Sequence, residues 1–131
     1  MNRIALTLAA LAGMALTAGP SVARERLSGE EKLAKLLEGR VAGEPSSCIN
    51  TRIHTNSQVI DETAIVYGRG RTIWVNVPAN ARDLDDHDAL LTKQFGSSLC
   101  RQDVITTFDA SGGFYTGNVF LSDFVPYTRV D

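Results

Sequence analysis

The amino-acid sequence predicts a small, mainly β fold at the margin of the α+β class: an antiparallel sheet or partly open barrel of about five or six strands, with an N-terminal helix and one further short helix. Two observations carry this prediction. From residue 47 onward, short β-rich runs with a period near two are separated by turns rich in glycine, asparagine and serine. Before them stands a single run with the helical period of 3.6 and a helix-start signal.

The first 23 residues have the pattern of a secretory signal peptide. Arg3 supplies the positive charge, residues 4–16 are almost wholly apolar, and residues 21–23 end in the small side chains that signal peptidase requires. We therefore expect cleavage between Ala23 and Arg24 and a periplasmic or secreted mature protein. The short, alanine-rich leader is of the bacterial type.

Cleavage of this leader from the 131-residue chain leaves 108 residues, the size of one domain. We expect a helix and linker at residues 24–46 and the β-rich domain at residues 47–131, without a membrane anchor because no second long apolar run follows. Loss of Arg3 takes the net charge from −2 to −3. This negative charge argues against a nucleic-acid partner, and we expect a monomer.

The N-terminal helix begins at a capping box. Ser28 and Glu31 have the spacing at which each side chain can bond the backbone N–H of the other residue. Gly39 is suited to end the helix, because glycine readily adopts the left-handed conformation found there. One face of this short helix is apolar and formed by Leu33, Leu36 and Leu37. Residues 41–45 are expected to be a linker.

The β-rich part begins with a predicted strand at residues 48–54, where isoleucine and threonine alternate with polar residues. Glycines at residues 68–71 predict a hairpin turn between the next strands. The remaining predicted β-rich runs are residues 58–61, 63–67, 72–77, 103–109 and 114–125. In residues 80–91, Asp85, Asp86 and Asp88 could cap and charge the first turn of a short helix that continues through Leu91.

Cys48 and Cys100 are the two cysteines of the chain. In an oxidising compartment such a pair can close a disulfide, and we expect this bond. A redox-active or nucleophilic thiol is the alternative, but it would require a Cys-X-X-Cys pair or a basic partner that the sequence does not indicate.

An acidic loop around His87 is the candidate metal site. Asp83, Asp85, His87 and Asp88 could together bind a divalent cation, yet the loop fails the calcium-binding pattern, since Asp88 stands where glycine is required. The leading interpretation is a solvated loop without metal, and no cofactor is expected.

The two histidines, His54 and His87, are the candidates for acid or base catalysis near neutral pH. Either could act with an aspartate in a small envelope hydrolase. The sequence lacks the Gly-X-Ser-X-Gly nucleophile elbow, and we name no catalytic residue.

A candidate interaction surface consists of Trp74, Arg69 and Arg71. Trp74 lies on the opposite strand face from Ile73 and Val75, which suggests partial exposure, and the two arginines lie in the glycine hairpin. The same hairpin could instead bind an anion through its amides and guanidiniums.

The segments around Cys48, residues 59–61, residues 70–76, residues 98–105 and residues 124–127 resemble a family of small exported proteobacterial proteins of unknown function. Many members carry four cysteines, and this chain lacks two of them. The resemblance implies export and a bond between Cys48 and Cys100, and it implies no catalytic residue.

These observations favour a non-enzymatic exported binding or interaction module whose partner is an unknown envelope protein or small ligand. The alternatives are the small hydrolase with a His/Asp pair and the divalent-metal binder.

Overall fold

The computed structural model describes residue 13 and residues 26–130. The expected signal peptide and its cleavage site therefore lie outside the described residues, apart from Gly13. The described part contains one α-helix and ten strands, all paired antiparallel, and the mainly β prediction is confirmed. The strands form sheets of five, three and two strands rather than one closed barrel.

Helix α1 (Gly29–Leu37) begins as the sequence predicts. The Glu31 backbone N–H donates to the Ser28 hydroxyl at 3.2 Å, and the Ser28 N–H donates to the Glu31 carboxylate at 2.9 Å. Just after the helix, Gly39 has a φ of +71°, the left-handed conformation expected of a helix-ending glycine.

The five-stranded sheet has the order β1-β10-β5-β4-β3. Its strands are β1 (Arg40–Ala42), β3 (Ser57–Ile60), β4 (Ala64–Tyr67), β5 (Thr72–Asn76) and β10 (Phe124–Arg129). The hairpin between β4 and β5 turns through Gly68 and Gly70, both with a φ of +89°. This turn is the one that the glycines predict.

Two smaller sheets complete the fold. The three-stranded sheet has the order β6-β8-β9, with β6 (Asp88–Thr92), β8 (Val104–Asp109) and β9 (Tyr115–Phe120). The two-stranded sheet pairs β2 (Cys48–Asn50) with β7 (Ser98–Cys100). A 3-10 turn, η1 (Ala81–Asp83), follows β5.

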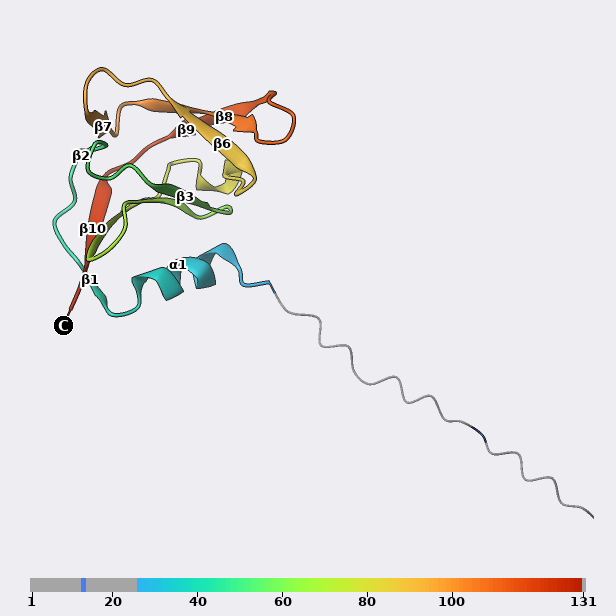
Figure 1. Cartoon of the computed structure of the whole chain (residues 1–131), viewed down its shortest axis with the longest axis horizontal. Coiled ribbons are helices and arrows are strands. Elements are labelled where there is room, and N and C mark those ends of the chain that lie inside the picture. Colours follow the sequence, from blue (N-terminus) through green and yellow to red (C-terminus); the bar gives the residue numbers. More distant parts are fainter. Residues whose placement is uncertain (1–12, 14–25, 131) are drawn as a thin grey trace, which may run out of the picture.

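The five-stranded sheet is the middle layer of the molecule, with α1 on one side and the smaller sheets on the other (Figure 1). Strand β4 is buried along its whole length because its side chains alternate between two apolar clusters, one on each face of the sheet. The cluster under the helix contains Ile60, Ala64, Val66, Ile73 and Val75, packed by the three leucines of α1. The larger cluster, on the opposite face, contains Ile49, Ile65, Tyr67, Leu84, Leu99, Ile105, Val119, Leu121 and Phe124.

Three local predictions are wrong. The expected linker at residues 41–45 begins inside β1, which pairs with β10. The expected strand at residues 48–54 ends at Asn50, because the chain turns after that residue. The expected short helix through Leu91 is replaced by η1 and by β6, whose side chains alternate in burial and pair with β8. A helix of so few residues is unstable by itself, whereas pairing with a neighbouring strand gives the same backbone groups hydrogen-bond partners.

The disulfide between Cys48 and Cys100 is present and joins β2 to β7 at directly opposed positions. Its Cα atoms are 4.0 Å apart and it closes a separation of 52 residues. A disulfide is compatible with an oxidising, exported location. Within the described ranges, no helix has the length and apolarity needed to cross a membrane.

Candidate functional site

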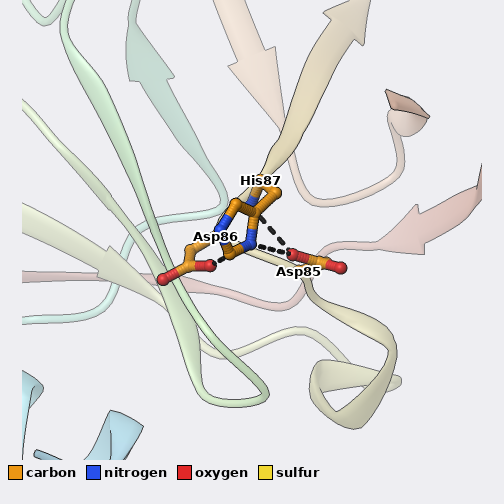
Figure 2. A group of neighbouring side chains, drawn as sticks. All are labelled: Asp85, Asp86 and His87. Atoms are coloured by element: carbon orange, nitrogen blue, oxygen red, sulfur yellow. Dashed lines mark hydrogen bonds and ion pairs between the residues drawn. The ribbon is translucent and has the colours of Figure 1, made fainter. Parts of the chain in front are cut away.

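The side chains of Asp85, Asp86 and His87 converge in the loop that leads from η1 into β6 (Figure 2). The Nδ1 atom of His87 lies 3.0 Å from a carboxylate oxygen of Asp85 and 2.9 Å from one of Asp86. The backbone N–H of His87 also donates to Asp85 at 2.8 Å. The loop therefore holds the imidazole between two carboxylates.

These contacts change the protonation of both partners. The pKa of Asp85 lies below its ordinary value, first because the His87 backbone N–H donates to its carboxylate and then because the imidazole does. The pKa of His87 lies above its ordinary value, first because its ring bonds Asp85 and then because of the negative charge of Asp86. The arrangement thus favours the protonated imidazolium.

The loop borders a surface cavity of about 420 Å³ beside the N-terminus of α1. The Nζ atom of Lys32 in α1 lies 3.7 Å from a carboxylate oxygen of Asp86, so an ion pair links the helix side of the cavity to the loop side. The helix approaches closely because residue 29 is glycine: a Cβ there would overlap the Thr63 side chain and the Asp61 carbonyl oxygen. The lining of this cavity contains both basic and acidic side chains, so it does not indicate whether a ligand would be positively or negatively charged.

The structure separates the four metal candidates of the sequence. Asp83 accepts a hydrogen bond from Asn80 at 3.1 Å, and Asp88 accepts one from Thr116 at 2.7 Å. Neither belongs to the convergent group, whereas Asp86, which was not among the four, does. Asp88 is kept apart from the group because it already lies in β6, where its side chain faces the same side of the strand as Leu90.

The convergent group brings three ligand atoms within 4.8 Å of one another. Oxygen and imidazole ligands at this spacing suit a divalent ion, provided that His87 gives up its proton. For hydrolysis, a His/Asp pair also needs a nucleophile. Among residues 26–130, no hydroxyl or thiol is hydrogen-bonded to either histidine.

His54 occupies a different place, beside Trp74. The Trp74 indole N–H donates to His54 Nε2 at 3.1 Å, and the rings meet edge to face at 5.9 Å between centroids. Trp74 is half-buried against the larger cluster. Of the candidate interaction surface, only Arg69 and Arg71 are exposed, in the hairpin turn. The carbonyl oxygens of Gly70 and Arg71 in that turn accept hydrogen bonds from Arg40.

An exposed apolar face covers the outer side of the three-stranded sheet. We call it the outer face and define it by three cross-strand rows: Ala89, Phe108 and Tyr115; Leu91, Thr106 and Asn118; and Val104 with Phe120. The most exposed apolar members are Tyr115 at 58%, Phe120 at 53%, Leu91 at 48% and Val104 at 46%. Ile105 of β8 and Val119 of β9 face the opposite side and are buried in the larger cluster.

The outer face was missed in the sequence, although β8 carried a signal for it. Ile105 is apolar and buried, while Val104 and Phe108 are apolar on the opposite side of the same strand. A strand with one wet face should alternate apolar with polar residues. The apolar residues on both faces of this strand could have indicated the surface.

Comparisons of the chain with protein-family models, with curated proteins and with solved structures found no match. The family resemblance therefore stays a prediction.

Proposed function

We propose that this protein is a non-enzymatic exported binding module of the bacterial envelope, and that its partner docks on the outer face. The observation that carries the proposal is the cluster of half-exposed side chains at Leu91, Val104, Tyr115 and Phe120. Contiguous exposed apolar surface on a small protein is typical of an interaction site. Aromatic side chains such as Tyr115 and Phe120 are enriched in the centres of interfaces.

The edges of the same sheet support this choice. At β9, the backbone N–H of Ala79 donates to the Phe120 carbonyl, and the Phe120 N–H donates to the Asn80 side chain, so this edge is covered at Phe120. Strand β6 pairs only with β8 in the described part of the chain. The partner could therefore extend from the outer face onto the open edge of β6.

The test is site-specific photo-crosslinking in the native periplasm. A photoreactive phenylalanine analogue at Phe120 should capture one partner, and the same analogue at Val41, a similarly exposed residue of β1, should not. Leu91→Lys should reduce capture from Phe120, because a charged side chain in the middle row of the face must be desolvated when the partner binds. Equal capture from both sites, or capture unaffected by Leu91→Lys, would contradict the proposal.

A divalent-metal binder is the second candidate function, and its support is the convergence of Asp85, Asp86 and His87. Zinc should then raise the melting temperature of the wild-type protein and leave that of His87→Ala unchanged. Asp83→Asn is the matched control and should respond to zinc as the wild type does. An identical melting temperature with zinc and with chelator would exclude this function.

A further inference from the structure

A second cavity, of about 310 Å³, opens beside β2 and β6, and none of its lining residues belongs to the outer face. We propose that it binds a neutral, polyhydroxylated ligand of monosaccharide size. Its volume lies at the lower end of the range for small-molecule sites.

The lining of this cavity has a consistent chemical character. Six of its side chains are polar and none carries a carboxylate, ammonium or guanidinium group: Thr51, His54, Thr55, Ser57, Thr92 and Gln94. Hydroxyl and amide groups both donate and accept hydrogen bonds, as the hydroxyls of a sugar do. A charged ligand would find no counter-charge here, and a hydrophobic ligand would meet little apolar wall besides Leu99 and Tyr67.

Tyr67 supplies an independent observation. Its side chain is 5% exposed, its ring packs edge to face on Phe124, and it forms part of the cavity wall. The hydroxyl oxygen is buried and has no hydrogen-bond partner within the described ranges. A buried polar group without a partner is costly, and a phenylalanine would fill the same space without that cost. Because this oxygen is closed to a water-sized molecule, a ligand reaches it from the cavity only when the Tyr67 ring or a neighbouring wall side chain shifts, and a ligand hydroxyl would then provide the missing partner.

Neighbouring groups are held in place to meet such a ligand. The Thr51 hydroxyl lies 2.8 Å from Gln94 Oε1 and 3.1 Å from the Ser97 carbonyl oxygen, which fixes the side chain of Gln94. Because the Trp74 indole can only donate, His54 Nε2 must accept, and the ring proton of the neutral imidazole stays on Nδ1. The cavity therefore presents both donors and acceptors.

The experiment is an NMR titration of the ¹⁵N-labelled protein, expressed from its full-length gene and purified after export, with glucose and N-acetylglucosamine at millimolar concentration. We expect at least one neutral sugar to shift the amide signals of Thr51, Thr92 and Gln94 and to leave those of Val104 and Phe120 unchanged. Glucose 6-phosphate is the charged comparator and should bind more weakly. This result is independent of partner capture at the outer face.

Two variants test the named hydroxyls. Tyr67→Phe and Thr92→Val should each keep the fold and weaken the binding of that sugar by about three- to tenfold, the effect of one lost hydrogen bond. Thr106→Val makes the same change on the outer face and should bind as the wild type does. The proposal is wrong if neither sugar shifts the cavity signals, if both cavity variants bind normally, or if glucose 6-phosphate binds best.

Discussion

At the scale of single residues, the structure depends on a few polar side chains with defined partners. Asn76 is fully buried at the end of β5, where its Nδ2 donates to the Ser122 carbonyl at 2.7 Å and its Oδ1 accepts from the Ser122 N–H at 3.1 Å. One amide thus satisfies both backbone groups of a residue in the connection to β10. No helix or strand pattern in the sequence marks this role, because the partner lies 46 residues away.

Asn76→Ala should therefore lower the free energy of unfolding by about 2 kcal/mol, since two part-buried backbone groups each lose a partner at ~1–3 kcal/mol. Urea unfolding followed by circular dichroism measures this change. Asn56→Ala, at an exposed position, is the control and should change stability by less than about 0.5 kcal/mol. Similar values for the two variants would show that the Asn76 bonds contribute little.

The contact between His87 and the two aspartates gives a pH prediction. By NMR, the imidazole of His87 should titrate with a midpoint above its ordinary value of 6.5, and Asp85→Asn should lower that midpoint. Asp83→Asn removes a nearby carboxylate that does not contact His87 and should have a much smaller effect. A wild-type midpoint at or below 6.5 would mean that the contact does not persist in solution.

The signs of these pKa shifts define the pH window of any stabilisation. Because the pKa of His87 is raised in the folded state, its contribution is complete below 6.5 and is lost as the pH rises through the raised value. Because the pKa of Asp85 is lowered, its contribution is complete above 3.8 and is lost as the pH falls through the lowered value. The pair stabilises most between these limits, and only weakly, since both side chains are exposed.

At the scale of elements, strand pairing decides the structure where local signals are weak. The capping box and the three leucines of α1 are local features, and the structure confirms the helix that they predict. The acidic residues before β6 are also a local helix signal, yet β6 pairs with β8 from Asp88 to Thr92. A helix signal supported by only one turn does not determine the local structure when a neighbouring strand supplies the hydrogen bonds.

The close approach of α1 to the turn between β3 and β4 gives a prediction at this scale. Gly29→Ala should destabilise the protein by about 1–3 kcal/mol, because the new methyl group overlaps the Thr63 side chain and the Asp61 carbonyl. Helix propensity alone predicts the opposite sign, since alanine is favoured over glycine by about 1 kcal/mol. Thermal unfolding measures the difference, with Glu30→Ala as the control, and a stabilised Gly29→Ala variant would contradict the packing argument.

At the scale of the whole molecule, the five-stranded sheet separates two apolar clusters, and the disulfide fastens the β2–β7 pair at the end of the larger one. Ile49 and Leu99, each next to a cysteine, are buried in this cluster. The cross-link therefore holds together two short strands whose own pairing spans only three residues.

Removing the disulfide by Cys48→Ala with Cys100→Ala should cost about 4 kcal/mol of unfolding free energy, the value for a loop of this length in the chain-entropy model. Urea unfolding with and without reductant measures the cost. The wild type should lose stability in reductant, and the double variant should not respond to it. An equal response of the two proteins, or two free thiols in the intact mass of the wild type, would contradict the bond.

The sequence by itself determined the mainly β class, the start and end of α1, the glycine hairpin and the pairing of Cys48 with Cys100. These features depend on neighbouring residues, on the periodicity of side chains or on the presence of only two cysteines. Only the tertiary structure decided that residues 41–45 begin in a strand and that the expected second helix is β6. The structure alone showed that the carboxylate of Asp86 faces the imidazole of its chain neighbour His87, and it alone placed Tyr67 in the wall of a polar cavity.

The outer face is also a feature that only the tertiary structure decided, because its rows join residues of three strands from Ala89 to Phe120. Side-chain alternation within one strand shows which residues share a side, but it does not show which side another element covers. That choice is made by the packing of Ile105 and Val119 into the larger cluster. Long-range burial of one side therefore leaves the apolar residues of the other side exposed.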